Sequence, residues 1–199
     1  MTPQAILTIS RDIVNDTNAA AYRQSNDELL RYLSEAIGLA MAVRSEFFYA
    51  TTTHICAAGA AQTLASASAL VEVQGITGGA RLTKMNKQAL DAFNPGWVSA
   101  TAAATQQWDR DMNDALKFWV YPPATAGQSL DVKVLPVPPS YLSANLSDTM
   151  TAPDWMKAAL ASYVAGRAET KDDEHVNSGR AVAMNAQFAD AIKAGQGAQ

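Results

Sequence analysis

Residues 117–134 carry the clearest β-strand signals of the chain and read Lys117-Phe118-Trp119-Val120-Tyr121-Pro122-Pro123-Ala124-Thr125-Ala126-Gly127-Gln128-Ser129-Leu130-Asp131-Val132-Lys133-Val134. The first half of this stretch is aromatic and β-branched, which favours a strand, and Pro122-Pro123 should end that strand. Leu130 to Val134 alternates apolar and charged residues, the pattern of a strand with one wet face. Because residues 124–127 form a connecting turn, we expect the two strands to pair as an antiparallel hairpin.

Other strand signals lie on the N-terminal side of this stretch. Residues 51–55 are mostly β-branched, and residues 70–73 form a second apolar candidate strand. Gly78-Gly79 predicts a turn, and Asn86 can cap a short helix that ends near Phe93. Together these signals predict a β-rich lobe over residues 50–139.

Helical patterns occupy both ends of the chain. Ser25 and Glu28 predict a capping box, and from residue 29 to 44 apolar residues recur at three-four spacing. Helices are also predicted after Pro153 and towards the C-terminus, separated by a charged corner at 171–174, and residues 194–199 should fray. We therefore predict an α+β fold, in which residues 1–49 and 140–199 form a helical lobe that carries the β-rich lobe as an insertion.

Composition narrows the classes of function. The chain has 199 residues, 48% of them hydrophobic, with a net charge of −4 and 15 scattered basic residues. A protein that grips nucleic acid needs clustered Lys and Arg, so tight phosphate binding is not expected. The longest low-charge stretch, residues 50–71, is too polar to span a membrane.

No residue pattern predicts catalysis, a cofactor or a metal. His54 and Cys56 stand two apart, but a zinc site needs about four ligands, and a buried cysteine at a strand end is the simpler interpretation. Asp109, Asp111 and Asp114 lack the spacing of a calcium loop and favour a turn. We therefore expect a protein that is not an enzyme.

Aromatic residues are the candidates for contact with other chains. A nucleic-acid stacking platform is interleaved with basic residues, whereas Trp108 is followed by Asp109. Trp buries a large area and is enriched at interfaces, so packing or subunit contact is the better interpretation. The interface candidates are Trp97, Trp108, Trp119, Tyr121, Trp155 and Phe188.

Three segments together resemble the head-to-tail adaptor, or connector, proteins of short-tailed bacteriophages. The first comprises residues 13–16 and 25–36. The second comprises Leu90 to Trp97, Trp108-Asp109, Phe118 to Pro123 and Val134 to Pro138. The third runs from Ala159 to Ala168, with Arg180-Ala181 and Phe188 beyond it. Two departures are Ser34, where relatives often have Asn, and residues 57–69, which align with nothing in the family.

The resemblance implies a structural protein of the virion neck, assembled in the host cytoplasm. Such proteins form a ring, typically a homo-dodecamer, between the portal protein and the tail nozzle protein. Genomic DNA passes through the lumen without sequence-specific binding, and no membrane, cofactor or catalysis is involved. Two alternatives stay open: another neck or tail-completion protein, such as a stopper or tail tube component, and a small hydrolase that uses His54 or Cys56.

Overall fold

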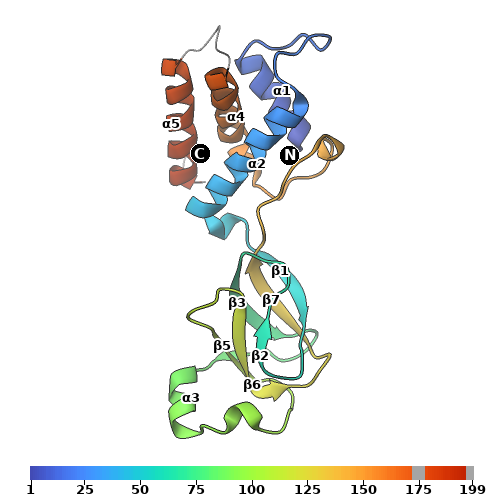
Figure 1. Ribbon diagram of the computed structural model, residues 1–199, viewed down its shortest axis with the longest axis vertical. Helices are drawn as coiled ribbons and strands as arrows, with labels where there is room; N and C mark the ends of the chain where they lie inside the picture. Colours follow the sequence, from blue (N-terminus) through green and yellow to red (C-terminus); the bar gives the residue numbers. More distant parts are fainter. Residues whose placement is uncertain (172–177, 196–199) are drawn as a thin grey trace. The chain divides into compact units, whose positions relative to one another are not determined.

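A computed structural model describes residues 1–171 and 178–195 of the chain. The described part forms two compact units. The helical unit comprises Met1–Phe48 and Pro138–Gln199, and the β unit comprises Tyr49–Val137. The predicted α+β class, with helices at both ends and strands in the middle, is confirmed (Figure 1). Most of the predicted charged corner at 171–174, and the tail at 196–199, lie outside the described residues.

The helical unit is built around one central helix. Its long helices are α1 (Pro3–Ile13), α2 (Asn26–Val43), α4 (Lys157–Lys171) and α5 (Ser178–Ala194), with short 3₁₀ turns at η1 (Ser45–Phe47), η3 (Ser143–Asn145) and η4 (Asp154–Met156). Helix α4 contacts α1, α2 and α5, and every residue from Ala159 to Gly166 is buried (Figure 1). Small residues permit this close packing: a Cβ on Gly166 would lie 3.2 Å from the Cβ of Met184 in α5.

The start of α2 confirms half of the predicted capping box. Ser25 Oγ accepts a hydrogen bond from the Glu28 N–H at 3.2 Å, which satisfies one free donor of the first turn. The Glu28 carboxylate accepts hydrogen bonds from Tyr32 and Lys171 instead of reaching back to Ser25. The N-terminal cap is therefore present, but the box is not closed as predicted.

The β unit has two sheets that share a core. The first has strand order β1-β7-β3, with β1 at Ala50–Ile55, β7 at Ser129–Leu135 and β3 at Ala69–Ile76. The second has order β2-β6-β5-β4, with β2 at Gly59–Thr63, β6 at Lys117–Ala124, β5 at Gln107–Arg110 and β4 at Thr83–Lys84. Helix α3 (Lys87–Phe93) and η2 (Trp97–Ser99) connect β4 to β5. As predicted, Asn86 caps α3 through its side-chain oxygen.

The predicted hairpin between residues 117–121 and 130–134 is wrong. Both strands exist, but β6 pairs with β2 and β5, whereas β7 pairs with β1 and β3. Each strand turns one face inward, and Phe118 and Val120 of β6 share a core cluster with Leu130, Val132 and Val134 of β7. The connecting turn therefore crosses from one sheet to the other, because face-to-face packing buries both apolar faces at once.

The prediction that Pro122-Pro123 stops the strand is also wrong. Strand β6 continues through both prolines to Ala124, with a cis peptide bond between Tyr121 and Pro122. Proline lacks only the donor, and its carbonyl still accepts: Pro123 O takes a hydrogen bond from Ala103 N–H at 3.0 Å. The register of β2 against β6 shifts between Gly59 and Ala61, which accommodates the prolines opposite this irregularity.

Candidate interaction surfaces

An aromatic cluster packs against the outer face of the second sheet, the face that points away from the core shared by the two sheets. The Trp97 ring makes edge-on contacts with Trp119 and Tyr121, with 6.1 Å between ring centroids in each pair. Trp97 is fully buried, and its indole N–H donates to Asp91 Oδ1 at 2.8 Å. Helix α3 and η2 thus hold one tryptophan inside the unit, while Trp119 and Tyr121 keep part of their surface exposed.

Beside Trp119 lies an open groove of about 580 Å³, between the β4–α3 connection and the turn after β5. Asp111 Oδ2 accepts a hydrogen bond from the Trp119 indole at 3.1 Å, and the Lys87 ammonium lies 4.7 Å from the centroid of the Trp119 ring. Asp109 Oδ2 accepts the backbone N–H of Lys87 at 3.0 Å. Asp91 Oδ2 also accepts a hydrogen bond from Lys87 Nζ at 2.6 Å, so hydrogen bonds to three aspartates hold the groove walls in place.

The acids of this region are stabilised as carboxylates. A hydrogen bond from Lys87, followed by one from Trp97, holds the pKa of Asp91 below its ordinary value. For Asp111 the pKa is lowered first by the backbone N–H of Asn113 and then by Trp119. The acidic cluster predicted as a turn does form Asx turns at Asp111 and Asp114, whereas Asp109 belongs to strand β5, which the sequence did not predict.

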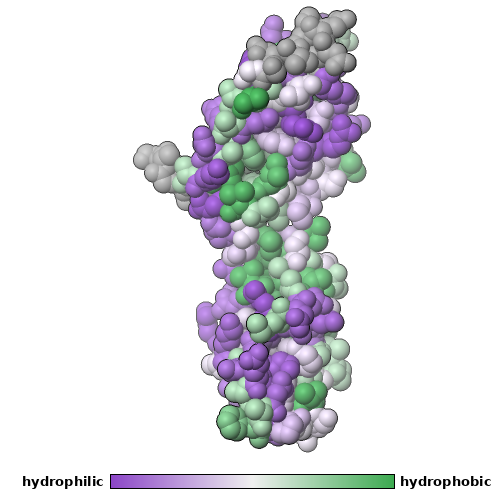
Figure 2. Space-filling model, turned by 60° about the vertical axis from the view of Figure 1, so that its left-hand side comes forward, coloured by the Kyte–Doolittle hydropathy of each residue, from purple (hydrophilic) through white to green (hydrophobic). Residues whose placement is uncertain are grey.

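Two apolar side chains of this region are almost fully exposed. Met112 is 86% exposed at the rim of the groove, and Phe93 at the end of α3 is 90% exposed. On the face drawn in Figure 2, apolar residues form small groups separated by polar ones, not one continuous patch. Singly exposed apolar side chains are common on soluble proteins, so Met112 and Phe93 are candidates for contact with another chain and do not by themselves define a surface.

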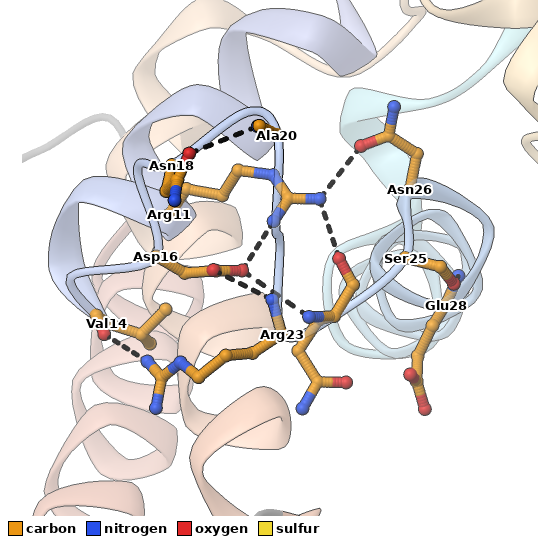
Figure 3. Close-up of polar contacts among 10 residues, drawn as sticks. Arg11, Val14, Asp16, Asn18, Ala20, Arg23, Ser25, Asn26 and Glu28 are labelled. Atoms are coloured by element: carbon orange, nitrogen blue, oxygen red, sulfur yellow. Dashed lines mark hydrogen bonds and ion pairs between the residues drawn. The ribbon is translucent and has the colours of Figure 1, made fainter.

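A buried polar network fixes the connection between α1 and α2, and the sequence did not predict it. The Arg11 guanidinium donates to Asp16 Oδ2 at 2.5 Å, to Gln24 O at 2.8 Å and to Asn26 Oδ1 at 2.9 Å (Figure 3). Asp16 also accepts the backbone N–H of Arg23 at 2.9 Å. Arg11 and Asp16 are both nearly excluded from solvent, with side chains 6% and 4% exposed. This ion pair shapes an otherwise irregular loop.

The sequence model of the SU10 adaptor protein family matches residues 1–199, the whole chain. The chain belongs to the SU10 adaptor protein family. A search of curated proteins gives no match. The resemblance to phage head-to-tail adaptors, inferred from three separate segments, is thereby confirmed at the level of the family.

In this member of the SU10 adaptor family the six predicted interface residues fall into two groups. Trp97, Trp108 and Phe188 are buried inside their own units, where Phe188 packs on Tyr163 with ring centroids 4.8 Å apart. The partly exposed residues are Trp119, Tyr121 and Trp155, the last in edge-on contact with Phe47 at 5.3 Å. Only these three combine packing with accessible surface, and their role at an interface stays a prediction.

His54 and Cys56 do not have the environment of an activated nucleophile. Burial raises the pKa of the Cys56 thiol to about 11, so the thiolate is scarce at neutral pH. Burial also lowers the pKa of His54, whose Nε2 lies 3.4 Å from Gln62 Oε1. Both shifts favour the neutral forms of the two groups.

Within residues 1–171 and 178–195, no group of three His, Cys, Asp or Glu side chains is placed to hold a metal ion. Within the same residues, no helix is both long enough and apolar enough to cross a membrane.

Proposed function

We propose that this chain is a structural head-to-tail adaptor, which forms a ring between the portal protein and the tail nozzle of a tailed phage. The observation that carries the proposal is the match of the SU10 adaptor protein family to residues 1–199. The ring, typically of twelve subunits in the proteins that the chain resembles, lies in the virion neck. It is assembled in the host cytoplasm.

The charge of the chain supports a passive channel. The net charge is −4, and the 15 basic residues are not gathered in one segment. Several of them are neutralised by neighbouring acids, among them Arg11, Lys87 and Lys117. Since binding to DNA requires several free cations that face phosphates, DNA can pass such a wall without being held.

The two compact units support a role in joining different partners. A closed ring of identical subunits needs two different surfaces on each subunit, one for each neighbour, and docking between portal and nozzle needs two more. We propose that the helical unit and the β unit divide these contacts. On the β unit, the candidates for such contacts are the exposed Met112 and Phe93 and the partly exposed Trp119.

A non-catalytic role is part of the proposal. The small-hydrolase alternative depends on His54 or Cys56, and the raised pKa of the Cys56 thiol opposes its use as a nucleophile. Substitution of each of these residues by Ala should leave assembly unchanged.

The proposal is tested by mixing the purified chain with purified portal rings and measuring the mass of the product by light scattering. We expect a portal complex larger by a whole ring of subunits. A free chain that stays monomeric is compatible with assembly on the portal alone, so the portal mixture decides. A chain that stays monomeric in the presence of portal rings would contradict the proposal.

A further inference from the structure

Strand β1 is an edge strand without the usual protection. Residues Ala50–Ile55 stand at the end of the order β1-β7-β3, so one side of β1 pairs with β7 and, among the described residues, its other side meets no strand. All its residues except His54 are exposed. Exposed edges of soluble proteins carry lysine, proline or a bulge that blocks further pairing, and Ala-Thr-Thr-Thr-His-Ile has none of these.

A slit runs along this free edge. It has a volume of about 320 Å³, with residues 52–55 of β1 on one side and residues 63–67, which follow β2, on the other. At one end the sides are joined, because Gln62 Oε1 accepts the backbone N–H of Ala57 at 2.9 Å and lies 3.4 Å from His54 Nε2. Thr52 and Thr53 precede His54 in β1 and so lie farther from this connection. An added strand would therefore run along Thr52 and Thr53.

The chemistry of the slit selects an uncharged occupant. Residues 47–71, which include both sides of the slit, contain no Asp, Glu, Lys or Arg. A charged side chain placed there would lose hydration without gaining a partner. Small and β-branched residues, in contrast, pair well with a row of threonines across a sheet.

The same unit presents a segment with these properties. Residues 92–108 form the second longest stretch without Asp, Glu, Lys or Arg, and within it residues 100–104 read Ala-Thr-Ala-Ala-Ala. These residues are exposed, and residues 101–104 lie outside any helix or strand. Ala100 has extended backbone angles, φ −63° and ψ 160°. Ala103 N–H donates to Pro123 O, so one side of the segment is held on β6.

We propose that the free edge of β1 binds residues 100–104 of a second copy of this chain as an added strand. This inference rests on the proposed ring, in which each subunit meets its neighbours through two different surfaces. The slit lies near the start of β6, where Lys117 is paired with Thr63, and the donor segment lies near its end, at Pro123. Two such surfaces on one subunit can join copies head to tail, whereas pairing of β1 with β1 would stop at a dimer.

Paired cysteines test this contact. In a Cys56→Ala background, the chain carrying both Thr53→Cys and Ala102→Cys is assembled with portal rings and oxidised. Cys56 is 3% exposed, so its removal eliminates the remaining thiol without changing the surface. We expect a ladder of disulfide-linked multimers up to the full ring. The matched control replaces Ala102→Cys by Ala80→Cys, an exposed position in the turn after β3, and should give no ladder.

The outcomes separate this inference from the proposed function. Portal-bound rings without a ladder would overturn the strand contact and leave the adaptor ring standing. Open crosslinked chains without portal-bound rings would support the strand contact and overturn the proposed ring. If neither crosslinked chains nor portal-bound rings form, both proposals are overturned. Disulfide-linked dimers formed by Thr53→Cys alone would show pairing of β1 with β1 and overturn the inference.

A second variant gives a readout that does not depend on oxidation. Thr52→Lys places a charge in the slit at a position opposite Val132, where β7 offers no carboxylate, and we expect loss of ring formation at concentrations where Ala80→Lys still assembles. Both chains should keep the circular dichroism spectrum of the parent. Equal assembly of the two variants would overturn the inference.

Discussion

Ala50 lies directly opposite Val134 in the antiparallel pairing of β1 with β7. These residues stand close to the two ends of the β unit, Tyr49 and Val137. The chain therefore enters and leaves the β unit at neighbouring positions, which is the geometry of a domain inserted into another fold.

This pairing predicts that residues 49–137 fold by themselves. A fragment with these ends should give a β-type circular dichroism spectrum and a single cooperative transition in urea, because its core cluster lies within the fragment. The control fragment 57–137 lacks β1, and the midpoint of its unfolding transition should lie at a lower urea concentration. If the 49–137 fragment shows no cooperative transition, the two lobes are not independent domains.

Arg11→Met should strongly destabilise the helical unit. It leaves Asp16 charged and buried without its cation, a change that costs about 3–5 kcal/mol in buried pairs. The free energy of unfolding is measured in urea. The control is Arg31→Met, because Arg31 is 71% exposed and its pairing with Glu28 should contribute no more than about 1 kcal/mol. Equal effects of the two variants would refute the structural role of the Arg11 network.

Gly166→Leu should separate α4 from α5. The added side chain would meet Asn185 Oδ1 and the Cβ of Met184, at 3.1 Å and 3.2 Å from the first added carbon alone. Overpacking of this kind costs about 1–3 kcal/mol. Gly38→Ala is the matched control, because nothing lies within 4 Å of its Cβ and alanine in mid-helix should stabilise α2 by about 0.5–1 kcal/mol. A neutral Gly166→Leu would contradict the close approach of α4 and α5.

Cys56 should resist alkylation and make stability depend on alkaline pH. Burial raises its pKa from 9.0 to about 11, so the folded chain keeps a proton that the unfolded chain releases between these values. The contribution of the protonated Cys56 thiol to the free energy of unfolding is fully present below pH 9 and is lost as the pH rises towards 11. Urea unfolding at several pH values should show this decline in the parent chain and a weaker one in Cys56→Ala. Rapid alkylation of the folded chain at pH 8 would contradict the burial.

The pattern of residues predicted the elements better than it predicted their partners. Alternation at residues 130–134 correctly indicated a strand with one buried face, but alternation does not say which strand lies alongside. The short connection suggested a hairpin, whereas burial of both apolar faces required strands in separate sheets. Strand β2, Gly-Ala-Ala-Gln-Thr, was missed because alanine and glycine have weak strand propensity and its pairing with β6 is a tertiary effect.

The candidate surfaces were predictable only in residue type. Tryptophan predicts burial or contact, and only the fold separates buried Trp97 from partly exposed Trp119. The Arg11 network could not be predicted, since Arg11 and Gln24 are brought together by the backbone of the loop between them. Asn15, two residues after the end of α1, has φ 53°, a left-handed conformation that asparagine adopts more readily than most residues with a side chain.

A cryo-electron microscopy map of the chain bound to its portal protein would show whether the chain forms the proposed ring. The proposal predicts a closed ring of identical subunits beneath the portal, with an open axial channel and the side that faces away from the portal left free for the nozzle. A map in which the portal carries no ring of this chain, or carries isolated copies around its rim, would contradict the account.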